Sequence, residues 1–248
     1  MHFHLSIFGQ KTVAVKDRSR QLLLTNRKTT MSTKKKTIIS FDFDDVLVDT
    51  NIVPTVLKEF NHPLGDAKTH INIYDWTQFS QEIVDEIHRR FETPSYNKGP
   101  RVLKDAERVV SEIIKMGFDV VVTTARTYKL HEVTDCLVKD AFPGVKEISY
   151  VRRSAKSIAL RSTQAALHID DMPKHVSDAV SNANAHGVLF SNEVTLWNHK
   201  EAEGFKKNSA SNDGRKEIVI SNLSDLPSLV EMLLVSGGIS TVYKMRSV

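Results

Sequence analysis

From residue 37 onward, short apolar runs alternate with longer stretches whose apolar residues recur at helical spacing. This alternation is typical of a parallel β-sheet whose strands are joined by helices. It predicts an α/β fold with a Rossmann-like parallel sheet. The predicted strands occupy residues 37–42, 118–124, 147–151, 166–170, 187–190 and 217–220. The predicted helices occupy residues 101–117, 128–142, 154–162, 173–187 and 224–234.

Residues 51–100 interrupt this alternation, because they contain two helical patterns, at about 54–60 and 80–93, and no strand pattern. We therefore expect a small helical cap inserted after the first strand. The sheet domain then consists of residues 37–50 and 101–235.

Two further segments lack the pattern of a strand or a helix. Residues 198–214 are polar and rich in Gly, Ser and Asn, which predicts a surface loop. Residues 236–248 follow the last predicted helix, and we expect them to form a C-terminal tail.

The basic residues of the chain are concentrated at its N-terminus. Residues 1–36 contain nine Lys or Arg and one acidic residue, a net charge of +8, so the rest of the chain carries −4. Basic arms of this kind bind nucleic acid in some proteins and direct targeting in others. Terminal segments are also commonly unstructured, and we expect a disordered tail here.

Cys136 is the single cysteine, which excludes an internal disulfide and a CxxC zinc site. It lies in a helical pattern, so we expect a small core residue rather than a nucleophile. No run reaches the roughly 18 apolar residues that a membrane-spanning helix requires. We expect no membrane partner and a reducing, cytoplasmic location.

Polar side chains follow three of the predicted strands, where the carboxyl ends of parallel strands meet at one edge of the sheet. Buried carboxylates repel one another, so a metal ion or a lysine must lie among them. Carboxylate oxygens suit Mg²⁺, a free carboxylate can attack phosphorus, and lysine and hydroxyl groups can bind phosphoryl oxygens. The set consists of Asp42 and Asp44 (first strand), Thr123, Thr124 and Arg126 (second strand), Asp170 and Asp171 (fourth strand) and Lys156, in the helix before the fourth strand.

The segments FDFDDVLVDT (41–50), VVVTTAR (120–126) and HIDDMP (168–173), together with Lys156, resemble the four motifs of the haloacid dehalogenase-like (HAD) phosphohydrolase superfamily, in the same order. The resemblance covers roughly residues 37–235. Val46, the helical insertion and the segment TLWN (195–198) resemble the 5'(3')-deoxyribonucleotidase branch of that superfamily.

The resemblance implies a role for the residues of the first and fourth motifs. Asp42 matches the nucleophile, which forms an aspartyl-phosphate. Asp44 matches the general acid/base, and its backbone carbonyl joins Asp42 as a ligand of Mg²⁺. Asp171 matches a direct metal ligand, with Asp170 nearby or bound through water.

The second and third motifs imply the phosphate-binding groups. Thr124 matches the phosphate-binding hydroxyl, with Thr123 as the alternative. Lys156 matches the stabilising lysine, although Arg152 and Arg153 are close enough in sequence to take its place. Arg126 either reaches a phosphate or caps a helix.

Two groups of side chains could either contact the substrate or have a structural role. Tyr74, Trp76 and Phe79 lie in the predicted cap, where aromatic rings either stack on a nucleobase or pack the cap onto the sheet domain. His168 and His175 flank the acidic pair, and a histidine in such a place is more commonly a hydrogen-bonded structural residue.

These observations predict an Mg²⁺-dependent phosphomonoesterase whose substrate is a small phosphorylated molecule, a nucleoside or deoxynucleoside monophosphate. Two alternatives remain open. One is a 3'-phosphatase on nucleic-acid ends that holds the polymer with the basic tail. The other is a non-catalytic protein of the same fold that binds metal or phosphate.

Overall fold

The structure, a computed structural model, describes residues 36–62, 79–97, 99, 101–151, 156–192, 195, 198–199, 202–204 and 214–235. Four residues named above lie outside these ranges: Tyr74, Trp76, Arg152 and Arg153. Nearly all of the basic N-terminal segment and all of residues 236–248 also lie outside them.

Six parallel strands form the main sheet, in the order β5-β4-β1-β6-β7-β8. The predicted α/β fold is confirmed, and each predicted strand is present within one residue of its expected bounds. The strands are β1 Ile38–Phe41, β4 Asp119–Thr124, β5 Glu147–Tyr150, β6 Ala165–Asp170, β7 His186–Phe190 and β8 Glu217–Ile220.

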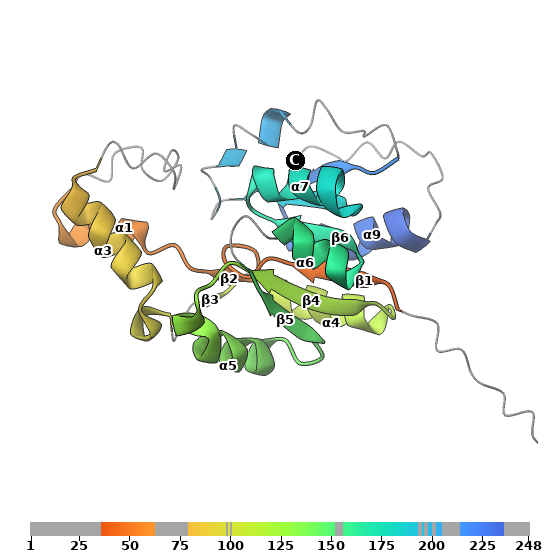
Figure 1. The fold of residues 1–248 in the computed structure, drawn as a ribbon, viewed down its shortest axis with the longest axis horizontal. Helices are drawn as coiled ribbons and strands as arrows, with labels where there is room; N and C mark the ends of the chain where they lie inside the picture. The colour runs from red at the N-terminus through yellow and green to blue at the C-terminus, as the bar shows by residue number, and fades with distance from the viewer. Residues whose placement is uncertain are drawn as a thin grey trace, which may run out of the picture. The chain divides into compact units, whose positions relative to one another are not determined.

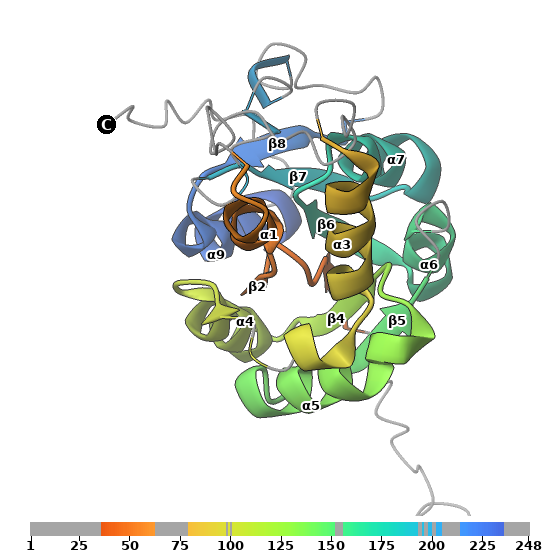
Figure 2. The same ribbon diagram turned by 90° about the vertical axis from the view of Figure 1, so that its left-hand side faces the viewer.

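Helices cover both faces of this sheet (Figures 1 and 2). The main core lies on the face of α4 (Ala106–Lys115), α5 (His131–Ala141) and α9 (Leu226–Val230), with a π-helical turn, η7 (Glu231–Val235), after α9. A second apolar cluster lies on the face of α6 (Lys156–Thr163) and α7 (Pro173–Ala183). Because β1 is covered on both faces, all four of its residues are buried, which explains why three of the four are apolar.

The insertion contains two helices, α1 (Val53–Glu59) and α3 (Gln81–Phe91), which lie side by side past the end of the sheet in Figures 1 and 2. The two helices share their own apolar cluster, against which Phe79 packs. Two short strands, β2 (Val48–Asp49) and β3 (Arg101–Val102), pair antiparallel at the base of the insertion.

Three short 3-10 turns also lie in the described residues. They are η2 (Pro94–Tyr96), which follows α3, η3 (Tyr128–Leu130), which precedes α5, and η6 (Leu223–Asp225), which precedes α9.

The structure corrects three expectations from the sequence. The helix expected from residue 101 begins at Ala106, because β3 occupies residues 101 and 102. Cys136 is exposed, since Thr134 and Val138 are the residues of α5 that face inward and Cys136 lies on the opposite side of the helix. The third correction is partial. The segment expected as a surface loop, residues 198–214, is described only in part, and its residues His199, Glu203 and Gly204 are exposed, whereas Asn198 and Ala202 are buried.

None of the helices in the described ranges combines the length and the apolar character that a membrane span demands.

A glycine lets β7 pack closely against α7. A Cβ atom at Gly187 would lie 2.6 Å from the backbone oxygen of Val176 and 2.7 Å from its Cγ1. We expect Gly187→Ala to lower the free energy of unfolding by about 1–3 kcal/mol through overpacking. Urea unfolding would measure the loss, with Gly204→Ala as the control, because no described atom lies within 4 Å of a Cβ there. Equal stability of the two variants would contradict the close contact.

Candidate active site

Asp42 lies directly after β1, and its backbone N–H continues the pairing with β6 by donating to the oxygen of Ile169 at 2.8 Å. The side chain is buried, and its Oδ1 accepts a hydrogen bond from the backbone N–H of Phe43, also at 2.8 Å. These contacts fix the carboxylate at the carboxyl end of the central strand.

The chain turns sharply just after Asp42. Asp45 has a φ of 57°, in the left-handed region. Aspartate tolerates this region better than most residues do, because its short side chain can bind nearby backbone. Its Oδ1 accepts hydrogen bonds from the N–H and the hydroxyl of Thr50, at 3.0 and 3.1 Å. These bonds hold together the loop that carries Asp44.

Lys156, the first residue of α6, joins two of the carboxylates. Its Nζ lies 2.8 Å from Oδ2 of Asp42 and 2.7 Å from Oδ2 of Asp170, and its side chain is buried. Burial alone would lower the pKa of Lys156, but attraction to Asp170 and Asp42 outweighs it and raises the pKa above its usual range. The lysine is therefore charged and shared between two motifs that are more than a hundred residues apart.

Asp170 is bound by several donors besides Lys156. Its Oδ1 accepts from the N–H of Met172 at 2.8 Å, and its Oδ2 lies 3.0 Å from Nε2 of His168 and 3.2 Å from Nδ1 of His175. Burial opposes the charge of Asp170, but Lys156 and these hydrogen bonds prevail and hold its pKa well below the usual range.

A buried hydrogen-bond chain runs from Asp170 across three neighbouring strands. Burial lowers the pKa of His168, so the ring is neutral, and its Nε2–H donates to Asp170. Its Nδ1 then accepts from the hydroxyl of Ser40 at 3.1 Å, and Ser40 accepts from the hydroxyl of Thr123 at 2.9 Å. The carboxylate thus sets the direction of every bond in the chain.

The same chain separates the two threonines of β4. The hydroxyl of Thr123 is bonded to Ser40 inside the sheet. Successive residues of a strand point to opposite faces, so Thr124 points to the other side. The hydroxyl oxygen of Thr124 accepts from the N–H of Arg126 at 3.2 Å, and a hydroxyl that accepts in this way can still donate its own proton.

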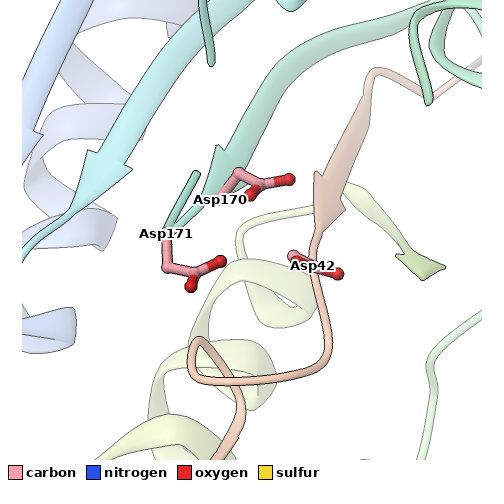
Figure 3. Close-up of side chains that lie close together, drawn as sticks. All are labelled: Asp42, Asp170 and Asp171. Carbon is pink, nitrogen blue, oxygen red and sulfur yellow. The ribbon is translucent and has the colours of Figure 1, made fainter. Parts of the chain in front are cut away.

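Three carboxylates converge between the ends of β1 and β6 (Figure 3). Asp42, Asp170 and Asp171 each offer an oxygen, and the three oxygens lie within 4.8 Å of one another. Burial raises the pKa of Asp42 to about 7, and burial with repulsion from Asp170 and Asp42 raises that of Asp171 well above its usual range. One lysine does not balance three carboxylates, and hard oxygen donors at this spacing suit a small divalent cation. The residues therefore fit Mg²⁺.

Asp44 lies apart from this group and contacts Arg126 instead. Nη2 of Arg126 lies 2.7 Å from Oδ1 of Asp44, and Nε lies 3.0 and 3.1 Å from its two oxygens. The guanidinium also donates to the hydroxyl of Thr134 and to the side-chain oxygen of Asn97. The structure thus brings Arg126 to the proposed acid/base, and its expected contact with phosphate stays a prediction.

Two other residues from the sequence analysis, Phe79 and Asn198, contact different parts of the fold. Phe79 packs in the helical insertion and meets His62 edge to face, with ring centroids 5.4 Å apart. The Nδ2 of Asn198 donates to the backbone oxygens of Asp171 and Phe190, at 2.6 and 2.9 Å. Asn198 therefore fastens the turn after β6 to the end of β7.

The sequence analysis did not single out Ser40 or Asn97. It expected His168 and His175 to be hydrogen-bonded structural residues, and both contact Asp170. The alternation of side chains along β6 offered a signal for His168, because it lies two residues before Asp170 and so on the same face. Ser40 and Asn97 offered no such signal, since their partners are distant in sequence.

Comparison with protein families places the chain. The model of the family described as "5' nucleotidase, deoxy (Pyrimidine), cytosolic type C protein" matches residues 36–213, well over half of the sequence. The chain belongs to this family. The predicted resemblance to HAD-type phosphatases of the nucleotidase branch is thereby confirmed. No curated protein sequence matches the chain.

Solved structures share the fold at low sequence identity. A structure described as "a predicted phosphatase" from Clostridium acetobutylicum has 17% identity and a TM-score of 0.54, covering 80% of this chain and 99% of that one. A HAD family hydrolase from Deinococcus radiodurans with bound phosphate and sodium has 15% identity and a TM-score of 0.51, covering 79% and 96%. The L-2-haloacid dehalogenase of Xanthobacter autotrophicus has 11% identity and a TM-score of 0.50, covering 80% and 99%. These likenesses show the HAD fold.

Proposed function

We propose that the chain is an Mg²⁺-dependent phosphomonoesterase that forms an aspartyl-phosphate on Asp42. The observation that carries the proposal is the placement of Asp42 at the end of the central strand, in contact with Lys156 and next to Asp170 and Asp171. In a member of the nucleotidase family, this arrangement supplies a nucleophile, a cation and an acidic pair at one point.

In the first step, an oxygen of Asp42 attacks the phosphorus of the substrate. The new bond forms while the bond to the leaving oxygen breaks, and the electron pair passes to that oxygen. Asp44 gives the leaving oxygen a proton. Lys156 and the hydroxyl of Thr124 bind the other phosphoryl oxygens, whose charge is spread in the transition state.

In the second step, Asp44 takes a proton from water while the water oxygen attacks the phosphorus of the aspartyl-phosphate. The bond between phosphorus and Asp42 breaks, which releases inorganic phosphate and restores the carboxylate. Asp44 is thus protonated again at the end of each cycle, with a proton that comes from water.

Mg²⁺ would be held by the carboxylates of Asp42 and Asp171 and by the backbone carbonyl of Asp44. Asp170 stays beside them, since protein donors already occupy its oxygens. When bound, the ion neutralises charge on the phosphoryl oxygens.

Nucleoside or deoxynucleoside monophosphates are the proposed substrates, following the description of the family. The helices α1 and α3 would act as the cap over the site. Of the predicted aromatic group, we propose that Tyr74 and Trp76 contact the base, whereas Phe79 packs in the apolar cluster of the insertion. The family description also favours a cytoplasmic location.

The test is phosphate release from a matched panel, with Mg²⁺ and with a chelator. The panel holds 5'- and 3'-mononucleotides in ribo and deoxy forms, sugar phosphates and an oligonucleotide with a 3'-phosphate. We expect Mg²⁺-dependent release from mononucleotides. Preference for sugar phosphates or oligonucleotide ends would overturn the proposed substrate and keep the chemistry. Release from none of them would contradict the function.

A further inference from the structure

Arg126 binds Asp44 asymmetrically. Oδ1 of Asp44 accepts two contacts, at 2.7 Å from Nη2 and 3.0 Å from Nε, whereas Oδ2 accepts one, at 3.1 Å from Nε. The side chain of Arg126 is 4% exposed and that of Asp44 is 35% exposed. One oxygen is therefore fixed by the guanidinium, and the other keeps most of its capacity to bind a further group.

This asymmetry suits a group that must give and take a proton. A carboxyl group in that role has to be anchored by one oxygen while the other exchanges the proton with the leaving oxygen or with water. A planar guanidinium can anchor a carboxylate in a defined plane, which a lysine ammonium cannot do. Oδ1 is the anchored oxygen here, and Oδ2 is the exchanging one.

Arg126 is itself held in place on three sides. Its Nη1 donates to the hydroxyl of Thr134 at 3.1 Å, and that hydroxyl donates to the backbone oxygen of Leu130 at 2.7 Å. The guanidinium carbon lies 4.5 Å from the centre of the Phe43 ring, within cation–π distance. The guanidinium thus has a fixed plane before any substrate arrives.

The third contact reaches the helical insertion. Nη2 of Arg126 donates to Oδ1 of Asn97 at 3.2 Å. The Nδ2 of Asn97 donates to the backbone oxygens of Arg90, Phe91 and Thr93, at 3.2, 3.3 and 3.1 Å. Arg90 and Phe91 are the last residues of α3 and Thr93 follows shortly after, so Asn97 joins that end of the helix directly to Arg126.

We propose that Arg126 is a positioning residue for Asp44, and that Asn97 makes this positioning depend on α3. The proposal rests on the proposed function, because Asp44 must be the acid/base. A change at Arg126 would then impair the steps in which Asp44 moves a proton and spare the steps in which it does not.

Leaving-group dependence separates this role from a general loss of structure. Phenyl phosphate needs a proton on its leaving oxygen, whereas p-nitrophenyl phosphate has a leaving group that departs without one. For Arg126→Lys we expect kcat/KM on phenyl phosphate to fall about 10²-fold, toward the contribution of a general acid. The rate of the first step with p-nitrophenyl phosphate should fall far less. Its second step still needs the base, so p-nitrophenol should appear in a burst before slow turnover.

A double-mutant cycle tests whether Arg126 acts through Asp44. The double variant with Arg126→Lys and Asp44→Asn should have nearly the same kcat/KM on phenyl phosphate as the single Asp44→Asn variant. Asn97→Ala should show the same dependence on the leaving group, with a fall of only a few-fold in kcat/KM on phenyl phosphate. This variant replaces Arg126→Lys as the test if Arg126→Lys does not fold. Arg101→Lys is the control, because Arg101 follows Asn97 by only four residues and its exposed side chain pairs only with the half-buried Asp49 among the described residues.

The outcomes separate the two proposals. If the unaltered protein hydrolyses neither these two esters nor any member of the panel above, the proposed function fails. If it hydrolyses both, but Arg126→Lys lowers both rates equally without a burst, or lowers neither, only the positioning role is overturned. Additive losses in the double mutant would overturn it as well.

Discussion

Asp42→Asn should lower the rate of hydrolysis of the preferred substrate by roughly 10⁴-fold or more. Asparagine has no carboxylate to attack phosphorus, and the catalytic groups act as a unit. The fold should survive. The folded protein holds the Asp42 charge at a cost, because burial raises the pKa of this carboxyl to about 7. Removing that charge relieves repulsion from Asp170 and Asp44, so we expect stability to be kept or increased.

Two measurements check this result together. Initial rates with Mg²⁺ give the loss of activity, and urea unfolding gives the change in stability. Asp119→Asn is the matched control, because Asp119 begins β4 at the opposite end of the sheet and contacts Lys36 and Lys146. Near-normal rates in Asp42→Asn would show that another group attacks the phosphorus. A large loss of stability would show that Asp42 is a structural residue.

Lys156→Met should lower both stability and activity. The ammonium group compensates two buried carboxylates, and removal of one partner from a buried ion pair costs about 3–5 kcal/mol because the remaining charge is unpaired. We expect a loss of that size in the free energy of unfolding without Mg²⁺. Activity should also fall, because the phosphoryl oxygens lose a cation.

Mg²⁺ gives this prediction a second readout. A divalent cation bound to Asp42 and Asp171 would replace part of the missing positive charge, so Mg²⁺ should stabilise Lys156→Met more than the unaltered protein. Unfolding curves with and without Mg²⁺ measure the difference. Lys156→Arg keeps the charge but not the compact ammonium, so its stability should lie between those of Lys156→Met and the unaltered protein. Equal stability of Lys156→Met and the unaltered protein would mean that the lysine does not balance these carboxylates.

The buried chain from Thr123 to Asp170 explains how the site tolerates so much charge. Asp170 remains ionised because Lys156, His168 and His175 all contact it, and it in turn holds Lys156 near Asp42. Buried polar networks are costly unless each member has a partner. The hydroxyls of Ser40 and Thr123 supply the partners that His168 requires.

The sequence by itself determined the sheet and the chemistry gathered at its edge. The apolar runs of the six strands stand out because strands covered on both faces must be apolar throughout, and the helices between them require a parallel arrangement. Since parallel strands end at a common edge, the carboxylates after β1 and β6 and the hydroxyls of β4 were expected to lie together. The family follows from the same motifs.

Only the tertiary structure decided which partner each side chain takes. Thr123 faces Ser40 because of the register between β4 and β1, and the alternation along the strand could not say which of the two threonines did so. Arg126 meets Asp44, 82 residues away, and the bounds of β3 and the exposure of Cys136 likewise depended on neighbouring elements. Sequence periodicity fixes the face on which a residue lies, whereas the reach of a long side chain and its charged partner depend on distances that exist only after folding.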